Sequence, residues 1–249
     1  MAFTELKAKQ SVMWGNGPYE RVTNTLTDLH ELVIERADPK PGERVLDAAT
    51  GTGAVAILVA KRGADVVGMD LAPVLIATAR ERADEEGVNV HWDVGDAEAM
   101  DYDDASFDVV TSTCGVMFAP DHAAVARELA RVTKQGGRVA LACWTPEGGL
   151  GQMFGMMRPF LPPPAEGAGS PFTWGTKDHV RELLGESFEL EFEEHDSILR
   201  TADGEEYWEL FSTSYGPTKT AAEALDAERR EGDEVVHHRE YLLTLGARR

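Results

Sequence analysis

The feature that most restricts the fold of this chain is a run of short apolar segments that alternate with helical segments between residues 44 and 144. The apolar segments have strand length and lie at 44–49, 64–70, 88–94, 106–114 and 138–144. Helical segments are predicted at 54–62 and 73–86, and a further helix follows the capping residue Asp121. Strands that alternate with helices form mostly parallel sheets with helices on both faces. The sequence therefore predicts an α/β fold.

The segments on either side of this region are less regular. Residues 1–40 are predicted to form an N-terminal helical cap, broken at 14–18, with a second helix over 19–37. We take 41–249 as the main domain, and within it 145–175, rich in Gly, Pro, Met and aromatic residues, as a lid or substrate loop. A helix at 177–184, a strand at 188–195, a helical stretch at 205–230 and a last strand at 240–246 follow.

The charge balance excludes some classes of partner. The chain has 44 acidic and 24 basic side chains, which give a net charge of -20. A surface this negative repels nucleic-acid phosphates and anionic lipids, so we expect no nucleic-acid or membrane partner.

The cysteines, Cys114 and Cys143, are too few for a disulfide framework, and the N-terminus lacks the apolar core of a signal peptide. We expect a soluble cytoplasmic protein, either a monomer or a homodimer.

A glycine-rich turn follows the first predicted strand. Residues 51–56 read GTGAVA and match the pattern G-x-G-x-x-A, in which glycine lets the backbone turn sharply and lets a ligand approach closely. NAD enzymes, flavoenzymes and methyltransferases all use this pattern. Asp70 ends the second strand, where a carboxylate can accept hydrogen bonds from both hydroxyls of an unphosphorylated ribose. These features leave NAD and S-adenosylmethionine as alternatives.

Two other carboxylates favour S-adenosylmethionine. Asp47 lies inside the first strand, close to the turn, where it would repel an anionic dinucleotide and attract an ammonium or sulfonium. Asp96 follows the third strand and can accept a hydrogen bond from an adenine amine, while the next backbone N–H donates to the ring. No P-loop lysine and no dehydrogenase-like catalytic pair occur in the sequence.

Several motifs then carry a resemblance. LDAATGTG at 46–53, GMD at 68–70, GDAEAM at 95–100, FDVVTS at 107–112 and ELARVTKQGGRVALACW at 128–144 resemble the successive motifs of class I S-adenosylmethionine-dependent methyltransferases. The branch of ubiquinone and menaquinone biosynthesis methyltransferases is the most similar. The resemblance implies a Rossmann-like sheet of seven strands in the order 3-2-1-4-5-7-6, with the last pairing antiparallel.

The resemblance also implies roles for individual residues. Gly51 and Gly53 would pack against the methionine part, Asp47 would orient its ammonium, and Asp70 would hold the ribose. Leu71 would lie on the adenine face, Asp96 and the Ala97 backbone would bind its edge, and the main chain at 113–114 would meet the amino group. The chain departs from the family at 48–50, where Ala-Ala-Thr replaces a commoner glycine pattern. The complete candidate cofactor set is Asp47, Ala49, Gly51, Thr52, Gly53, Asp70, Leu71, Asp96, Ala97, Thr113 and Cys114.

The sequence says less about the acceptor. The implied reaction is transfer of a methyl group to an O, N or C atom of a small molecule, which leaves S-adenosylhomocysteine. His122 is the candidate general base, with an exposed first-turn histidine as the alternative interpretation. Candidate substrate-lining residues are Trp14, Tyr19, Met117 and Phe154, for which ordinary core packing is the alternative. The histidines show no metal-ligand spacing, so no metal site is predicted. An NAD-dependent oxidoreductase and a non-catalytic cofactor-binding protein are the rival functions.

Overall fold

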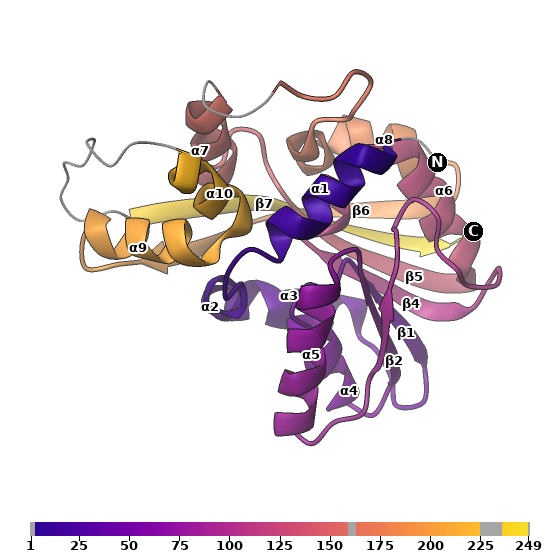
Figure 1. Cartoon of the computed structure of the whole chain (residues 1–249). Coiled ribbons are helices and arrows are strands. Elements are labelled where there is room, and N and C mark those ends of the chain that lie inside the picture. Colours follow the sequence, from indigo (N-terminus) through magenta and orange to yellow (C-terminus); the bar gives the residue numbers. More distant parts are fainter. Residues whose placement is uncertain (1–2, 159–162, 225–235, 249) are drawn as a thin grey trace.

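A computed structural model describes residues 3–158, 163–224 and 236–248, and its centre is a seven-stranded sheet in the order β3-β2-β1-β4-β5-β7-β6 (Figure 1). The first five strands run parallel, and β7 lies antiparallel between β5 and β6. The predicted strand order and the antiparallel final pairing are therefore confirmed. The strands are β1 (Arg44–Ala48), β2 (Asp65–Asp70), β3 (His91–Val94), β4 (Phe107–Thr113), β5 (Thr133–Trp144), β6 (Phe188–Arg200) and β7 (Val236–Arg248).

Helices cover both faces of the sheet. Figure 1 shows α3, α4 and α5 on one face and α6 and α8 on the other, while α9 and α10 lie side by side near one end of β6 and β7, where they contact α2 and α1. The helices are α1 (Thr4–Trp14), α2 (Glu20–Thr23), α3 (Thr27–Ala37), α4 (Ala54–Ala60), α5 (Pro73–Glu85), α6 (His122–Val132), α7 (Gly149–Met157), α8 (Lys177–Leu184), α9 (Gly204–Ser214) and α10 (Gly216–Ala224). Short 3₁₀ turns occur at Asn24–Leu26, Val116–Phe118 and Pro171–Gly175.

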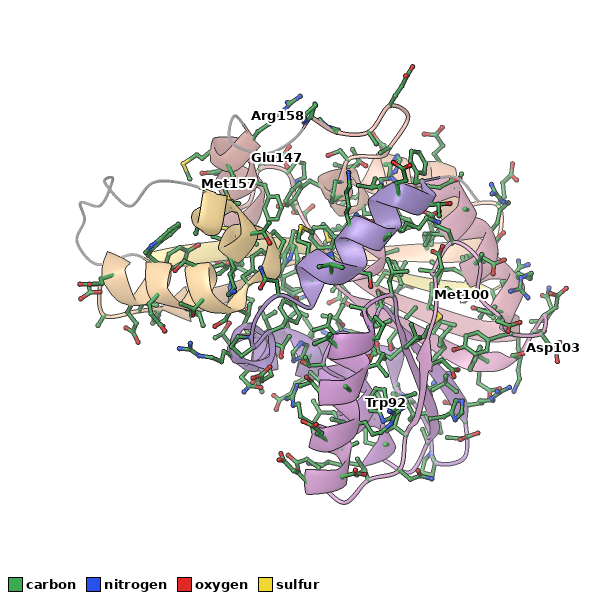
Figure 2. All side chains as sticks on the ribbon, in the orientation of Figure 1. Trp92, Met100, Asp103, Glu147, Met157 and Arg158 are labelled. Atoms are coloured by element: carbon green, nitrogen blue, oxygen red, sulfur yellow. The ribbon has the colours of Figure 1, made fainter. Side chains whose placement is uncertain are left out.

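The central strands are buried on both faces, which explains their continuous apolar sequences. Val45 in β1, Val110 in β4 and Leu141 in β5 are all fully inaccessible to solvent. Because helices pack on both sides, these strands do not alternate polar and apolar residues. The edge strand β6 alternates, since its outer face is exposed. Figure 2 shows side chains around the sheet, and Trp92 of β3, labelled there, is one of the buried core residues.

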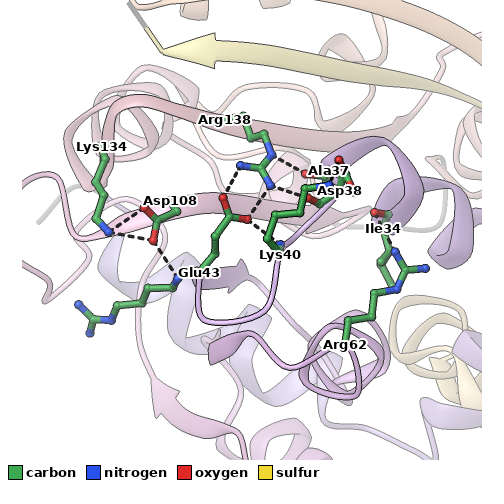
Figure 3. Close-up of polar contacts among 10 residues, drawn as sticks. Ile34, Ala37, Asp38, Lys40, Glu43, Arg62, Asp108, Lys134 and Arg138 are labelled. Atoms are coloured by element: carbon green, nitrogen blue, oxygen red, sulfur yellow. Dashed lines mark hydrogen bonds and ion pairs between the residues drawn. The ribbon is translucent and has the colours of Figure 1, made fainter.

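A polar cluster connects the elements near the amino-terminal ends of β1, β4 and β5 (Figure 3). The Arg138 guanidinium makes two hydrogen bonds to the Glu43 carboxylate, at 3.0 and 2.7 Å, and also donates to the Ala37 carbonyl at the end of α3. Beside it, Lys134 Nζ lies 2.8 Å from both carboxylate oxygens of Asp108. These contacts hold α3, β4 and β5 together at the edge opposite the strand ends that carry the candidate site.

The structure refines several sequence predictions. The helix expected over 19–37 is interrupted at Asn24–Leu26, because the hydroxyls of Thr23 and Thr25 bond back to carbonyls of the preceding turn. The predicted loop 145–175 contains α7 and a 3₁₀ turn, and the described part of the expected helical stretch at 205–230, which ends at residue 224, forms two helices that part at Tyr215. Residues 159–162 and 225–235 lie outside the described residues. None of the helices in the described ranges is both long and apolar enough to cross a membrane.

Candidate functional site

A cavity lies over the carboxyl ends of β1, β2, β3, β4 and β5. It straddles β1 and β4, where the strand order reverses, which is the position at which open α/β sheets bind ligands. Helix α1 crosses this edge and covers it from outside (Figure 1). The cavity brings together most of the predicted cofactor residues: Asp47, Ala49, Gly51, Asp70, Leu71, Asp96, Ala97, Thr113 and Cys114.

The turn between β1 and α4 uses the left-handed backbone region repeatedly. Ala49, Gly51 and Gly53 have φ values of 54°, 57° and 78°. A Cβ atom added to Gly51 would lie 3.5 Å from the Tyr19 ring, so the glycine leaves its backbone accessible from the cavity. The sequence pattern therefore identified a turn whose main chain faces the cavity at Gly51.

The structure places two other members of the turn away from the cavity. A Cβ added to Gly53 would lie 2.5 Å from Trp92, so this glycine permits close packing of α4 against β3. The Thr52 side chain is buried, and its hydroxyl lies 2.9 Å from an Arg82 nitrogen and 3.2 Å from the Thr23 hydroxyl. Neither Gly53 nor Thr52 is among the residues that line the cavity. Both residues therefore have packing roles in the structure, and their expected ligand contacts stay predictions.

Asp47 is a buried carboxylate at the floor of the cavity, with 2% of its surface exposed. It accepts hydrogen bonds from the hydroxyls of Thr50 (2.5 Å) and Thr111 (2.8 Å). Burial raises the pKa of Asp47 from 3.8 to about 6, because these neutral donors compensate only part of the lost hydration. A cation in the cavity would stabilise the ionised form.

Asp70 is the last residue of β2 and lines the cavity on the side of that strand. Its carboxylate accepts from the backbone N–H of Gly51 (2.8 Å) and of Ala72 (2.9 Å). Burial is the largest influence and raises the pKa of Asp70 above its usual value, while the backbone donors oppose it. Each carboxylate oxygen retains lone-pair capacity beyond these bonds. Asp70 is therefore fixed in place and can still accept hydrogen bonds from ligand hydroxyls.

Asp96, beyond β3, has a partner that the sequence did not reveal. Lys7 of α1 donates to Asp96 Oδ2 at 2.7 Å and also pairs with Glu98. The same Glu98 accepts from the backbone N–H of Asp121, at the start of α6. Nothing in the local sequence of α1 marks Lys7 as buried; only the docking of the helix over the sheet brings it here. The ion pairs hold α1 over the cavity.

The end of β4 forms the middle of the cavity. Cys114 takes a left-handed conformation (φ 53°), and its backbone N–H donates to the Ala142 carbonyl at 2.8 Å. Burial raises the pKa of the Cys114 thiol well above its usual value, which favours the protonated thiol at neutral pH. The Thr113 hydroxyl is buried and has no hydrogen-bond partner among the described residues. The β4 end thus contains a buried polar atom that has no hydrogen-bond partner among the described residues.

Aromatic side chains cover the cavity from above. Trp14 packs edge-on against Tyr19, Phe118 and Tyr215, at ring-centroid distances of 5.7, 4.7 and 5.5 Å. All four rings line the cavity, and Tyr215, at the break between α9 and α10, was not identified from the sequence. The predicted lining residues Met117 and Phe154 lie outside the lining. Met117 is fully buried core, and Phe154 packs behind Phe118 and Tyr215.

His122 does not reach the cavity. Its side chain is buried, and its Nδ1 lies 2.9 Å from Nε2 of His179, with Trp174 also in contact. Burial is the largest of the causes that lower the pKa of His122 to about 4, so the imidazole is neutral at pH 7. The expectation of an exposed first-turn histidine is wrong, and the geometry gives no support to His122 as the general base. Asp121 does cap α6, accepting from the backbone N–H of Ala124 at 2.9 Å.

The half of the cavity beyond β4 contains residues that the sequence did not single out. His30 of α3 and Arg239 of β7 are buried polar side chains there, beside Trp144 and Leu150. They are far apart in the sequence and carry no motif, so only the topology brings them together. Among the described residues, no three His, Cys, Asp or Glu side chains converge in a way that could hold a metal ion.

Comparisons with known proteins agree with this geometry. The family described as a methyltransferase domain matches residues 45–137. The chain is 36% identical to the uncharacterized protein Rv1403c of Mycobacterium tuberculosis over 220 residues, which cover 84% of this chain and 77% of the relative. It is also 40% identical to a demethylmenaquinone methyltransferase of Thermus thermophilus over 118 residues, 47% of this chain and 52% of that enzyme.

Solved structures show the same fold at lower identity. YcgJ of Bacillus subtilis superposes with a TM-score of 0.65 and 22% identity, over 88% of this chain and 97% of that chain. The [4+2]-cyclase SpnF superposes with a TM-score of 0.58 and 19% identity, over 89% and 80% of the two chains. The motif order, the strand order and the relatives together place the chain in the class I S-adenosylmethionine-dependent methyltransferase family.

Proposed function

We propose that this protein binds S-adenosylmethionine in the cavity and transfers its methyl group to an O, N or C atom of a small, largely apolar acceptor. The observation that carries the proposal is the row of carboxylates at successive strand ends, Asp47 on β1, Asp70 on β2 and Asp96 after β3. Asp47 in particular is a buried anion whose described hydrogen-bond partners are neutral, which suits a cationic ligand.

The proposed roles follow from the position of each group. Asp47 faces the part of the cavity that would take the ammonium, and Asp70 would accept from the ribose hydroxyls. Asp96 would accept from the adenine amine, with Leu71 packed on the ring. The cofactor, when bound, supplies a methyl group on a sulfonium that is already an activated donor. The protein mainly aligns donor and acceptor, and such positioning can supply roughly 7–11 kcal/mol of barrier reduction.

The ion pairs of Lys7 affect how the cofactor could enter the cavity. Lys7 and the acceptor oxygen of Asp96 are in contact, so binding of an adenine amine at Asp96 requires this pair to be shared or displaced. Because α1 also carries Trp14 over the cavity, its movement would open the adenine end and the aromatic cover together. We therefore assign α1 as the closing element of the N-terminal cap, and we propose a cytoplasmic enzyme whose two cysteines stay reduced.

The fold alone does not decide the reaction, since one structural neighbour is a [4+2]-cyclase. The rival dinucleotide ligand is disfavoured by Asp47, whose charge lies where pyrophosphate would bind. Calorimetry with S-adenosylhomocysteine and with NADH separates these ligands. We expect saturable binding of S-adenosylhomocysteine and none of NADH. Binding of NADH instead, or no binding of either ligand at millimolar concentration, would overturn the proposal. Transfer of labelled methyl groups to a panel of small apolar acceptors then distinguishes an enzyme from a non-catalytic binder.

A further inference from the structure

Arg239 is a buried cation with neutral partners. It lies on β7 with 2% of its surface exposed, and it lines the cavity. The guanidinium donates to the carbonyl and hydroxyl of Thr25 (both 2.8 Å) and to the carbonyl and hydroxyl of Ser197 (both 3.2 Å). Two carboxylates lie near by: Asp28 accepts a hydrogen bond from the Ser197 hydroxyl at 2.9 Å, and Asp196 accepts one from the Arg239 backbone N–H at 3.1 Å.

Among the other partly buried arginines, Arg82 also bonds only neutral groups, those of Thr52 and Asn24. Arg138 and Arg131 each make direct contacts with carboxylates, at 2.7 Å in both cases. Within the described residues, no carboxylate lies within ion-pair distance of the Arg239 side chain. Buried charges without a counterion are costly, and they persist mainly where function requires them. An anion in the cavity would supply the missing partner.

The sheet topology places Arg239 in the acceptor half of the cavity. Arg239 is two residues before Tyr241, which pairs with Trp144 at the end of β5, so it lies at the same sheet edge as the β4 end. In the strand order, β7 is two positions from β4 and three from β1. At a spacing of about 4.8 Å per strand, Arg239 lies roughly 10 Å along the sheet from β4 and roughly 14 Å from β1. The carboxylates assigned to the cofactor lie on the opposite side of β4.

The walls around Arg239 are apolar and aromatic. Leu26, Trp144, Leu150 and Phe211 line this half of the cavity. His30 also lines it, and burial, reinforced by nearby arginines, lowers the pKa of His30 to about 4, so it is neutral at pH 7. Among the described lining residues of this half, Arg239 is therefore the charged side chain, and its neighbours in the lining are mostly apolar.

On the basis of the proposed function, we propose that the methyl acceptor is a small ring-containing carboxylic acid whose carboxylate is bound by Arg239. The ring would lie between the apolar walls and extend toward the end of β4. In this proposal the bound carboxylate is not the methylated group. The carboxylate is an anchor that positions a different atom of the acceptor for transfer.

The test uses a pair of probes with the same ring system and different charge. Protein saturated with S-adenosylhomocysteine is titrated with 1-naphthoate and with 1-naphthamide by calorimetry. Wild type should prefer the carboxylate by about ten- to a hundred-fold, the factor expected for a charge-assisted hydrogen bond in a site that excludes water. Arg239→Met should abolish the preference, and Arg239→Lys should retain part of it. The control is Arg82→Met, because Arg82 is a partly buried arginine outside the cavity lining that bonds the Thr52 carbonyl.

The outcomes separate this inference from the proposed function. Arg239 also holds Thr25 and Ser197, so thermal unfolding and S-adenosylhomocysteine affinity are measured for every variant. If wild type binds both probes equally, or binds neither at millimolar concentration, the acceptor assignment is wrong even where S-adenosylhomocysteine binds normally. A carboxylate preference that survives in a folded Arg239→Met variant is equally contradictory. Failure of S-adenosylhomocysteine binding itself refutes the proposed function, and the wild-type probe comparison can then be made without it.

Discussion

Replacement of Asp47 by Asn should stabilise the ligand-free protein while weakening its ligand affinity. Burial raises the pKa of Asp47 from 3.8 to about 6. A pKa that is higher in the folded state means that ionisation disfavours folding, and this cost is fully present above pH 6 and absent below pH 3.8. At 1.36 kcal/mol per pH unit the cost at pH 7 is about 3 kcal/mol. The hydroxyls of Thr50 and Thr111 would bond an amide more weakly than a carboxylate. With this loss included, Asp47→Asn should raise the free energy of unfolding by about 1–3 kcal/mol at pH 7.

The same carboxylate predicts how ligand affinity depends on pH. S-adenosylhomocysteine carries an ammonium, which favours ionised Asp47, so affinity should be constant above pH 7 and fall about tenfold per pH unit below pH 6. Asp47→Asn should lower the affinity at pH 7 by about 10- to 100-fold and remove this pH dependence. Urea unfolding at pH 7 and calorimetry from pH 5 to 8 measure the two effects, with exposed Asp65→Asn as the control.

Equal wild-type affinity at pH 5 and pH 8 would refute the reasoning. So would a pH dependence that persists unchanged in Asp47→Asn, since the titrating group would then be another one, such as Asp70. A destabilised Asp47→Asn protein at pH 7 would show that the hydroxyl donors compensate the buried charge more fully than its raised pKa indicates.

Three further changes test other parts of the site. Asp70→Ala removes the acceptor for two ribose hydroxyls and should weaken S-adenosylhomocysteine binding by at least about 100-fold in calorimetry, given roughly 1.5–3 kcal/mol per hydrogen bond to a charged group; unchanged affinity would exclude Asp70 from the site. Lys7→Met breaks the ion pairs that hold α1, so hydrogen exchange in residues 4–14 should rise while the sheet stays protected; unchanged exchange would mean that the apolar contacts of α1 suffice. Gly53→Ala places a Cβ 2.5 Å from Trp92 and should cost at least about 1–3 kcal/mol more in urea unfolding than Gly136→Ala, which has a similar positive φ and nothing within 4 Å; equal losses would show that backbone strain alone determines the cost.

Much of the fold could be predicted because its signals are local. The apolar strand segments, the glycine turn and the Asp121 cap each have a physical cause within a few residues, and the strand order followed from the motif resemblance. Element ends were less accurate: the third strand begins at His91 and not at 88, since the preceding residues do not pair with β2. The sequence also gave no sign that α7 lies within 145–175, because glycine and methionine there obscure the helical spacing.

The candidate site also contains some residues that local sequence signals identify and others that they do not. Asp47, Asp70 and Asp96 could be proposed as site residues because each lies near the end of a recognisable strand or shortly after it. Lys7 and Arg239 were missed, since their burial depends on how α1 and β7 dock and on no local pattern. His122 was overvalued for the opposite reason. Its position just past β4 is correct, but its side chain turns toward His179 and Trp174, and a position in the chain does not fix a side-chain direction.

The most direct measurement is a crystal structure of the protein with S-adenosylhomocysteine. The account predicts the ribose hydroxyls within hydrogen-bond distance of Asp70, the adenine amine at Asp96 and the sulfur over the end of β4, facing the half of the cavity that holds Arg239. A ligand bound anywhere else, or one in this cavity with its ribose away from Asp70, would contradict it.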